Sequence, residues 1–140
     1  MTDKLSISYD MEVAFFDVDS YRIVWHGNYP KYFEVARCKL LENISFTYKD
    51  MEEAGYFFPI IDMKIKYIKP LTFGQKCTIT ATIIEWKNKL TIRYLIQDSE
   101  TGEKLTKGQT SQAAIQMPDH ITQFVSPDVL LHKVNKALNA

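Results

Sequence analysis

The spacing of apolar residues changes from a helical to a strand-like period in the middle of this chain, and that change limits what the chain can fold into more than any other feature. After residue 28 the buried-type positions recur at spacings of three and four, which predicts a helix of about four turns. They are Phe33, Ala36, Arg37, Leu40, Leu41 and Ile44. From residue 61 onward, apolar and polar side chains alternate, as they do in strands that bury one face. One long helix is therefore followed by a sheet that can cover it.

The spacing of turn residues divides the chain around this helix into strands. We predict a strand over residues 6–16 before the helix, and strands over 61–67, 77–86, 90–97 and 104–117 after it. The turns at Lys87-Asn88-Lys89 and at residues 98–102 are short enough to be hairpins, so the strands they join should be antiparallel neighbours. The predicted class is α+β, with an antiparallel sheet wrapped around a single helix.

Capping residues mark where the two helices should begin. Asn28, followed by Pro30, is expected to cap the long helix, and Ser126-Pro127-Asp128 is expected to cap a terminal amphipathic helix. No repeat or Gly/Ser linker interrupts the sequence. We therefore expect one domain over residues 1–140.

Charge and cysteine content exclude several classes of protein. The 17 Lys and Arg balance 17 Asp and Glu, which excludes the broad positive footprint of a nucleic-acid-binding protein. No apolar run reaches membrane-spanning length. Cys38 and Cys77 form no disulfide framework, and no His lies at metal-site spacing from them. We expect a cytoplasmic protein with reduced thiols, no metal and no nucleic-acid partner.

Reactive side chains are densest between the first predicted strand and the long helix, over residues 16–29. The first backbone N–H groups of a helix lack internal partners and carry the positive end of its dipole. They can stabilise a carbonyl oxygen that becomes negative, while a carboxylate on the preceding loop faces the same carbonyl. The segment predicts a minimal acyl-transfer site, with Asp19 or Asp17 as nucleophile or base and the N–H groups of residues 26–28 as oxyanion donors.

Purely structural roles for the same residues remain open at this point. An Asp-x-Asp-Ser stretch also serves turns and caps, and a single His before a helix is more often structural than catalytic. Glu34 and Arg37, three residues apart on the helix, are expected to form an ion pair. Cys38 is expected to be a small core residue rather than a nucleophile.

A family resemblance favours the catalytic role. Residues 17–37, DVDSYRIVWHGNYPKYFEVAR, resemble the signature of the 4-hydroxybenzoyl-CoA thioesterases and the Tol-Pal-associated acyl-CoA thioesterases, which share the hotdog fold. Weaker matches occur at residues 58–60, 67–74 and 85–89. The resemblance implies an antiparallel sheet wrapped around one long central helix.

The resemblance also implies roles for individual residues. Asp19 matches the catalytic carboxylate, and the backbone N–H of His26 is expected to point at the thioester carbonyl. The expected substrate-binding residues are Asn28, Tyr29, Lys87 and Lys89, with the two lysines near the phosphates of coenzyme A. Arg22 stands where the family usually has Gly, whose backbone is more permissive.

The function implied is hydrolysis of an acyl thioester, carried by coenzyme A or by an acyl carrier protein, to a free acid and a thiol. No cofactor is expected, because a thioester is already activated. Family members pair their sheets into a homodimer or a homotetramer, a dimer of dimers, with active sites at the subunit boundary. Two alternatives remain: a hotdog dehydratase using His26 and Glu34, and a non-catalytic protein that binds acyl thioesters.

Overall fold

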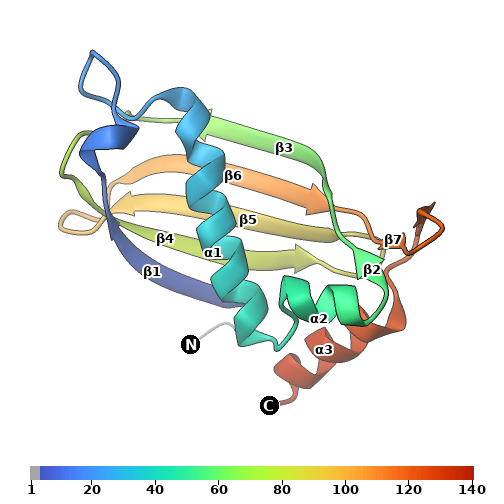
Figure 1. Ribbon diagram of the computed structural model, residues 1–140. Helices are drawn as coiled ribbons and strands as arrows, with labels where there is room; N and C mark the ends of the chain where they lie inside the picture. The colour runs from blue at the N-terminus through green and yellow to red at the C-terminus, as the bar shows by residue number, and fades with distance from the viewer. Residues whose placement is uncertain (1–3) are drawn as a thin grey trace.

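A five-stranded antiparallel sheet forms the main layer of the protein (Figure 1). The computed structural model describes residues 4–140. The strand order across the sheet is β1-β4-β5-β6-β3. The strands are β1 (Ser6–Glu12), β3 (Ile60–Tyr67), β4 (Lys76–Glu85), β5 (Leu90–Asp98) and β6 (Lys104–Gln112). The hairpins predicted at residues 87–89 and 98–102 join β4 to β5 and β5 to β6, so the antiparallel order is confirmed.

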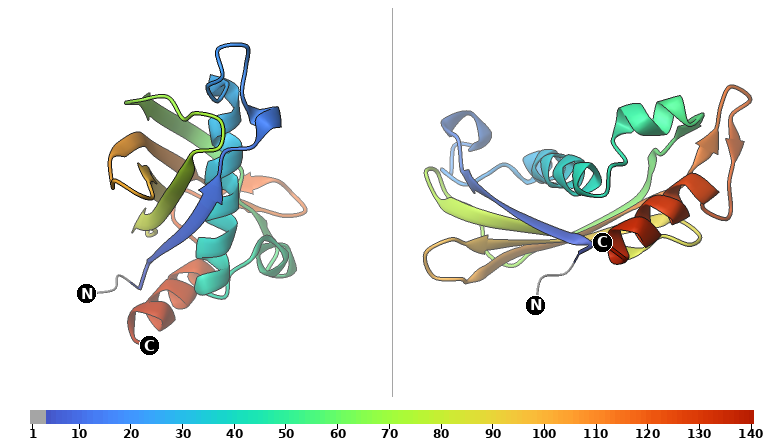
Figure 2. Two further views of the ribbon diagram at one scale, coloured as in Figure 1. Left: turned by 90° about the vertical axis from the view of Figure 1, so that its left-hand side faces the viewer. Right: turned by 90° about the horizontal axis from the view of Figure 1, so that it is seen from below.

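Helix α1 (Tyr29–Asn43) crosses one face of this sheet (Figures 1 and 2). Its apolar stripe is the core of the protein, because Phe33, Ala36, Leu40 and Leu41 are fully buried. Phe33 stacks on Tyr94 of β5 with ring centroids 4.4 Å apart. The sheet approaches α1 closely at Gly108 of β6, where an added Cβ atom would lie 2.4 Å from the Phe33 ring. The predicted long helix and the predicted fold class are confirmed.

Smaller elements extend the fold at one end of the sheet. Helix α2 (Tyr48–Glu53) leads into a second, three-stranded sheet of order β2-β7-β8, formed by Tyr56–Phe57, Ile115–Gln116 and Ile121–Thr122. Helix α3 (Asp128–Leu138) closes the chain and buries Leu130 and Val134. Across the described residues 4–140, no helix has the length and apolar content to cross a membrane.

Two of the predicted strands have the wrong bounds. The first was expected to reach Phe16, but β1 ends at Glu12, because Phe15–Asp17 coil into a 3₁₀ turn that directs the chain towards α1. The strand predicted over residues 104–117 is divided into β6 and β7, which belong to different sheets.

Both helices begin where predicted, but neither has a side-chain cap. Asn28 precedes α1, but its backbone is already helical, with φ −88° and ψ −13°, whereas a capping residue needs an extended backbone. Its side-chain amide donates instead to the Asp17 carbonyl oxygen at 2.8 Å. At α3, Pro127 precedes the helix and no side chain caps it, and the Ser126 hydroxyl is buried without a hydrogen-bond partner.

The expected ion pair between Glu34 and Arg37 does not form. The Arg37 side chain is buried, and its Nε donates to the Tyr48 hydroxyl at 2.7 Å. Its Nη1 donates to the Tyr94 hydroxyl at 3.3 Å. Both partners come from distant parts of the chain, so a long-range contact replaces the local one.

Candidate active site

The loop that contains Asp19 is a tight turn held by its own backbone. The Asp19 N–H donates to the Ile23 carbonyl oxygen, and the Arg22 N–H donates to the Asp19 carbonyl oxygen, both at 2.9 Å. The Tyr21 N–H donates to Asp19 Oδ1 at 2.8 Å, which fixes the carboxylate as well. This local network orients the side chain of Asp19.

Arg22 closes the turn with a left-handed backbone, at φ 65°. Gly adopts this conformation more readily, because a Cβ atom disfavours the left-handed region by about 1–2 kcal/mol. The Arg22 side chain is exposed, so the turn predicted from the resemblance forms with an Arg present.

We expect Arg22→Gly to stabilise the protein slightly, by up to about 1 kcal/mol. Relief of the left-handed strain favours the variant, and the larger entropy of Gly in the unfolded chain cancels part of that gain. Thermal unfolding of the two proteins measures the difference. A clearly lower melting temperature for Arg22→Gly would show that the Arg22 side chain supports the loop.

Asp17 anchors the loop to α1 rather than facing a free space. Its carboxylate is buried, forms an ion pair with Lys31, and accepts a hydrogen bond from the Tyr32 hydroxyl at 2.8 Å. Burial and the nearby Asp17 carboxylate raise the pKa of Tyr32, so the phenol keeps the proton that it donates. Both carboxylate oxygens of Asp17 are therefore occupied by protein partners.

Asp19 lies at a small hollow beside the start of α1. The hollow has a volume of about 190 Å³ and is lined by Asp19, Ile23, Val24, His26, Tyr29, Tyr67 and Pro70. Asp19 is half-buried, and in the described part of the chain no protein donor is recorded for its Oδ2 atom. The rest of the lining is mostly apolar.

The same hollow is lined by His26, the first residue of a short turn before α1. His26–Asn28 form a 3₁₀ turn that runs directly into α1. Across residues 4–140, neither the His26 nor the Gly27 N–H donates to a protein acceptor. Because the N-terminal end of a helix is positive, these free donors favour an oxygen that carries negative charge.

Tyr67 is a site residue that sequence reasoning did not single out. It is the last residue of β3, and its hydroxyl donates to the His26 carbonyl oxygen at 2.9 Å. Its ring meets the Tyr29 ring edge-on at 4.8 Å. The contact holds the backbone of the 3₁₀ turn against the sheet. The sequence signal was the position of Tyr67 at the end of a strand, just before Pro70.

The structure gathers some of the predicted site residues and separates others. Asp19, His26 and Tyr29 line one hollow, although the Asn28 amide is engaged by the Asp17 carbonyl oxygen. Lys87 and Lys89 are exposed in the β4–β5 turn. That turn lies at the opposite end of the sheet from the loop of Asp19 (Figure 1). Within one chain, the two lysines are remote from Asp19.

The hollow therefore combines a half-buried carboxylate with unpaired N–H donors at a helix start, in mostly apolar surroundings. Donors fixed in advance at the place where negative charge develops are an effective means of stabilising an oxyanion. Within the described residues, no group of three or more His, Cys, Asp or Glu is arranged to hold a metal ion. The arrangement suits attack on an activated carbonyl group.

Comparison with known proteins agrees with this geometry. A sequence model described as "Thioesterase-like superfamily" matches residues 13–132. A relative from Bacillus subtilis, "Putative acyl-CoA thioesterase YneP", is 30% identical over 106 residues, which are 76% of this chain and 77% of the relative.

Solved structures show the same fold. A DHNA-CoA thioesterase from Staphylococcus aureus superposes with a TM-score of 0.82 at 24% identity, over 96% of this chain and 89% of that one. The Staphylococcus aureus protein SAV2348, solved in complex with CoA, has a TM-score of 0.84 at 15% identity, over 99% of this chain and 87% of that one. The sequence matches, which span most of the chain, establish its family: it belongs to the thioesterase-like superfamily.

Proposed function

We propose that this protein hydrolyses acyl thioesters, carried by coenzyme A or by an acyl carrier protein, to a free acid and a thiol. The observation that carries the proposal is the hollow that Asp19 and His26 line together, beside a turn in which, across the described residues, the N–H groups of His26 and of its neighbour Gly27 have no protein acceptor. The family to which the chain belongs, and the name of the relative YneP, support the same reaction. The narrower relation to 4-hydroxybenzoyl-CoA and Tol-Pal-associated thioesterases is part of this proposal.

The thioester carbonyl oxygen would accept hydrogen bonds from the N–H groups, which stabilise it as it becomes negative. In one route, an Asp19 oxygen attacks the carbonyl carbon, the thiolate leaves, and water then hydrolyses the mixed anhydride. In the other, Asp19 takes a proton from a water molecule, and that water attacks the carbonyl carbon directly. Both routes use the same residues and need no cofactor.

The two aspartates have different roles in this proposal. Asp17 is bound by Lys31 and by the Tyr32 hydroxyl, and its carbonyl oxygen accepts from Asn28 and Trp25. It positions the loop. Asp19 lines the hollow and is assigned the chemistry.

A second copy of the chain is proposed to complete the site. Strand β3 is an edge of the main sheet, and four of its apolar side chains remain exposed. They are Ile60, Ile61, Met63 and Tyr67, with exposed fractions of 37%, 56%, 36% and 46%. An edge of this kind is a template for strand pairing. Because Tyr67 also lines the hollow of Asp19, pairing through β3 would bring the second copy to that hollow.

We expect the protein to sediment as a dimer or a tetramer, and the double variant Ile61→Asp/Met63→Asp to sediment as a monomer. Charged side chains on an edge strand oppose pairing with a second strand. Thioester hydrolysis should fall at least about tenfold in the same variant, because the hollow loses a wall.

Leu138→Asp, which alters an exposed apolar residue on α3, is the matched control and should change neither property. An active wild-type monomer would contradict the shared site.

Pairing through β3 also gives Lys87 and Lys89 a place in the site. If the β3 strands of two copies pair antiparallel about a two-fold axis, opposite ends of the two sheets lie side by side. The β4–β5 turn of the second copy would then approach the hollow of the first. As flexible point charges, these lysines would contact the exposed phosphates of coenzyme A.

Lys87→Ala/Lys89→Ala should raise KM for an acyl-CoA several-fold and change kcat little. Contacts to remote phosphates stabilise the ground state and the transition state alike. The difference should shrink at high salt, because exposed charges are screened. An acyl-pantetheine substrate, which lacks the nucleotide, provides the control and should show no difference. If KM for acyl-CoA is unchanged, the lysines do not bind the substrate.

The dehydratase alternative receives less support from the geometry. It needs a helical carboxylate beside His26, but Glu34 is exposed on α1 and is absent from the lining of the described hollow. A binding protein without catalysis would use the same hollow, with Arg22 as its distinguishing feature.

One experiment separates the three functions. Purified protein is incubated with a panel of acyl-CoA and acyl carrier protein thioesters, and thiol and acyl products are measured. The proposal predicts release of free thiol together with free acid. A new double bond in an intact thioester would indicate a dehydratase, and affinity without turnover would indicate a binding protein.

A further inference from the structure

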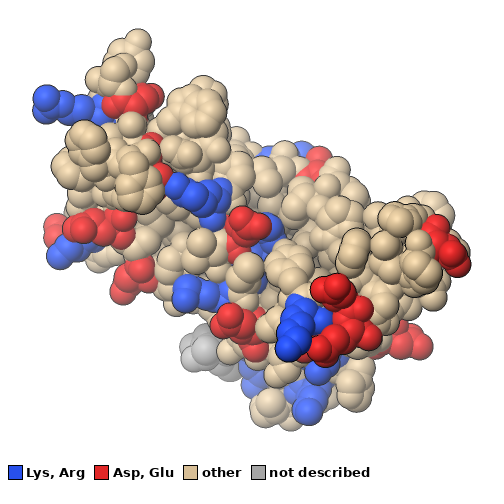
Figure 3. All heavy atoms as spheres, in the orientation of Figure 1, with Lys and Arg blue, Asp and Glu red and all other residues tan. Residues whose placement is uncertain are grey.

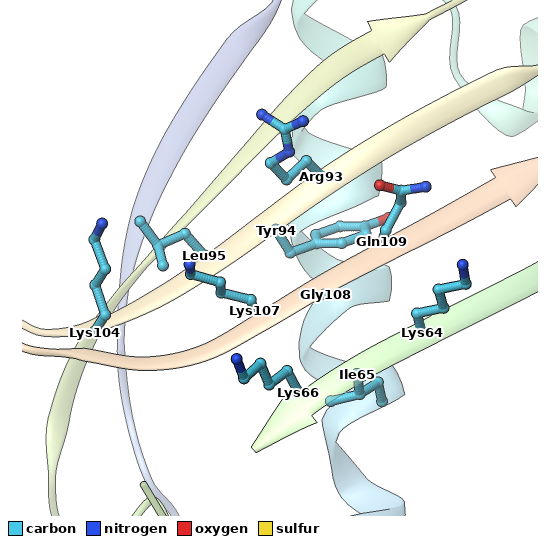
Figure 4. A pocket seen from close by; sticks show the side chains of 10 residues that line it. All are labelled: Lys64, Ile65, Lys66, Arg93, Tyr94, Leu95, Lys104, Lys107, Gly108 and Gln109. Carbon is cyan, nitrogen blue, oxygen red and sulfur yellow. The ribbon is translucent and has the colours of Figure 1, made fainter. Parts of the chain in front are cut away.

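The face of the main sheet that lies away from α1 carries a basic groove. The groove has a volume of about 530 Å³, and Figure 4 shows α1 behind its strands. Its polar lining is formed by Lys64 and Lys66 of β3, Arg93 of β5, Lys104 and Lys107 of β6, and Gln109. No Asp or Glu is among its lining residues in the described part of the chain.

The groove cations form no ion pair within residues 4–140. The two ion pairs of the described residues are Lys31–Asp17 and Lys69–Glu103, and neither includes a groove residue. Lys66 and Lys107 lie directly opposite each other in the β3–β6 register. Like charges at such paired positions destabilise a sheet. The Lys66–Lys107 pair therefore lowers the stability of the folded protein, and a bound anion would reduce the repulsion between the two charges.

The basic character of this face is local. The whole chain carries no net charge, and on the face that contains α1 acidic and basic side chains are intermingled (Figure 3). The five groove cations, Lys64, Lys66, Arg93, Lys104 and Lys107, line one depression without an acidic residue among them. Such a field concentrates anions at one place on the molecule.

We propose that this groove binds a small molecule that carries two or more phosphate groups, of the nucleoside bisphosphate or diphosphate class. Its volume is in the range of about 300–1,000 Å³ that small-molecule sites occupy. Cations on three neighbouring strands surround the depression, so separate phosphates can be contacted at once, and Lys suits phosphate as a compact point charge. A flat patch would instead favour a macromolecular surface.

The proposed ligand is a different molecule from the thioester substrate. The groove opens on the outer face of the sheet, whereas the hollow of Asp19 is formed by the loop before α1, the first residue of that helix and the end of β3. Strands β3 and β6 stand between the two sites. This site is thus independent of thioester hydrolysis, and its test requires no turnover.

Calorimetric titration of the full chain with adenosine 3′,5′-bisphosphate and with inorganic pyrophosphate tests the proposal. Wild-type protein should bind at least one of these probes saturably, with one molecule per chain. Lys66→Gln/Lys107→Gln should bind at least about tenfold more weakly. This variant should remain folded, because it removes a like-charge pair from the sheet.

Lys49→Gln/Lys136→Gln removes the same charge from exposed positions on α2 and α3 and should bind the probes as wild type does. Absence of saturable binding by both probes would overturn the proposal, as would equal weakening in the two double variants. Displacement of the probe by an acyl-pantetheine thioester, which has no nucleotide, would place the binding in the hollow of Asp19 and would also overturn it.

Discussion

Asp19→Asn is expected to lower kcat for thioester hydrolysis by at least about 100-fold, within the range of about 10²–10⁴ that a general acid or base supplies. The substitution keeps the shape of the side chain and its acceptor for the Tyr21 N–H, but it removes the charge needed to attack a carbonyl group or to take a proton from water. Steady-state kinetics should show KM within a few-fold of wild type, and the melting temperature should change little.

Two controls separate chemistry from loop structure. Asp17→Asn weakens the contacts of a buried carboxylate with Tyr32 and the half-exposed Lys31, so it should lower stability by about 1–2 kcal/mol and reduce turnover much less than Asp19→Asn does. Loss of turnover should also be milder in His26→Ala, because the backbone N–H that is the proposed donor remains. A larger loss of turnover at Asp17 than at Asp19, with both variants folded, would move the catalytic role to Asp17.

Phe33→Ala is expected to cost about 3–5 kcal/mol in the free energy of unfolding, which is typical for truncation of a buried Phe. The ring is fully buried, stacks on Tyr94 and fills the space above Gly108. Its removal leaves a cavity at the centre of the contact between α1 and the sheet. Urea unfolding of both proteins measures the difference.

Gly108→Ala provides the complementary change at the same contact. Its new Cβ atom would collide with the Phe33 ring, so the variant should lose about 1–3 kcal/mol through overpacking. In Phe33→Ala/Gly108→Ala the methyl group has room, and the loss should be clearly less than the sum of the two single losses. Additive losses would show that the two residues do not restrict each other.

The parts of the fold that depend on local pattern were predictable from the sequence. The buried stripe of α1 and the β4–β5–β6 hairpins follow from hydrophobic period and turn length, which neighbouring residues determine. The expected side-chain caps do not form. Asn28 is a typical capping residue type, but its backbone is helical, and Pro127 rather than Ser126 directly precedes α3. The predicted Glu34–Arg37 ion pair was wrong for another reason. Arg37 binds Tyr48 and Tyr94, which are distant in the sequence and approach it only when the chain folds.

The candidate site was likewise predictable only where it depends on local sequence. The spacing of residues 17–29 indicated a candidate site, and the resemblance assigned Asp19 as its proposed carboxylate. The distinct surroundings of Asp17 were not predictable, because they depend on how Lys31 and Tyr32 are presented by α1. Tyr67 joins the site through the end of β3, which no local pattern connects to His26.

The most direct test of the account is a crystal structure of Asp19→Asn with an intact acyl-CoA. Turnover is expected to be too slow to consume the ligand, so the thioester itself can be located. The account predicts its carbonyl oxygen at about 2.7–3.1 Å from the N–H groups of His26 or Gly27. It predicts the carbonyl carbon at about 3–3.5 Å from the side chain at position 19, or bridged to it by one water molecule. A thioester ordered elsewhere, with its carbonyl group remote from both, would contradict the account.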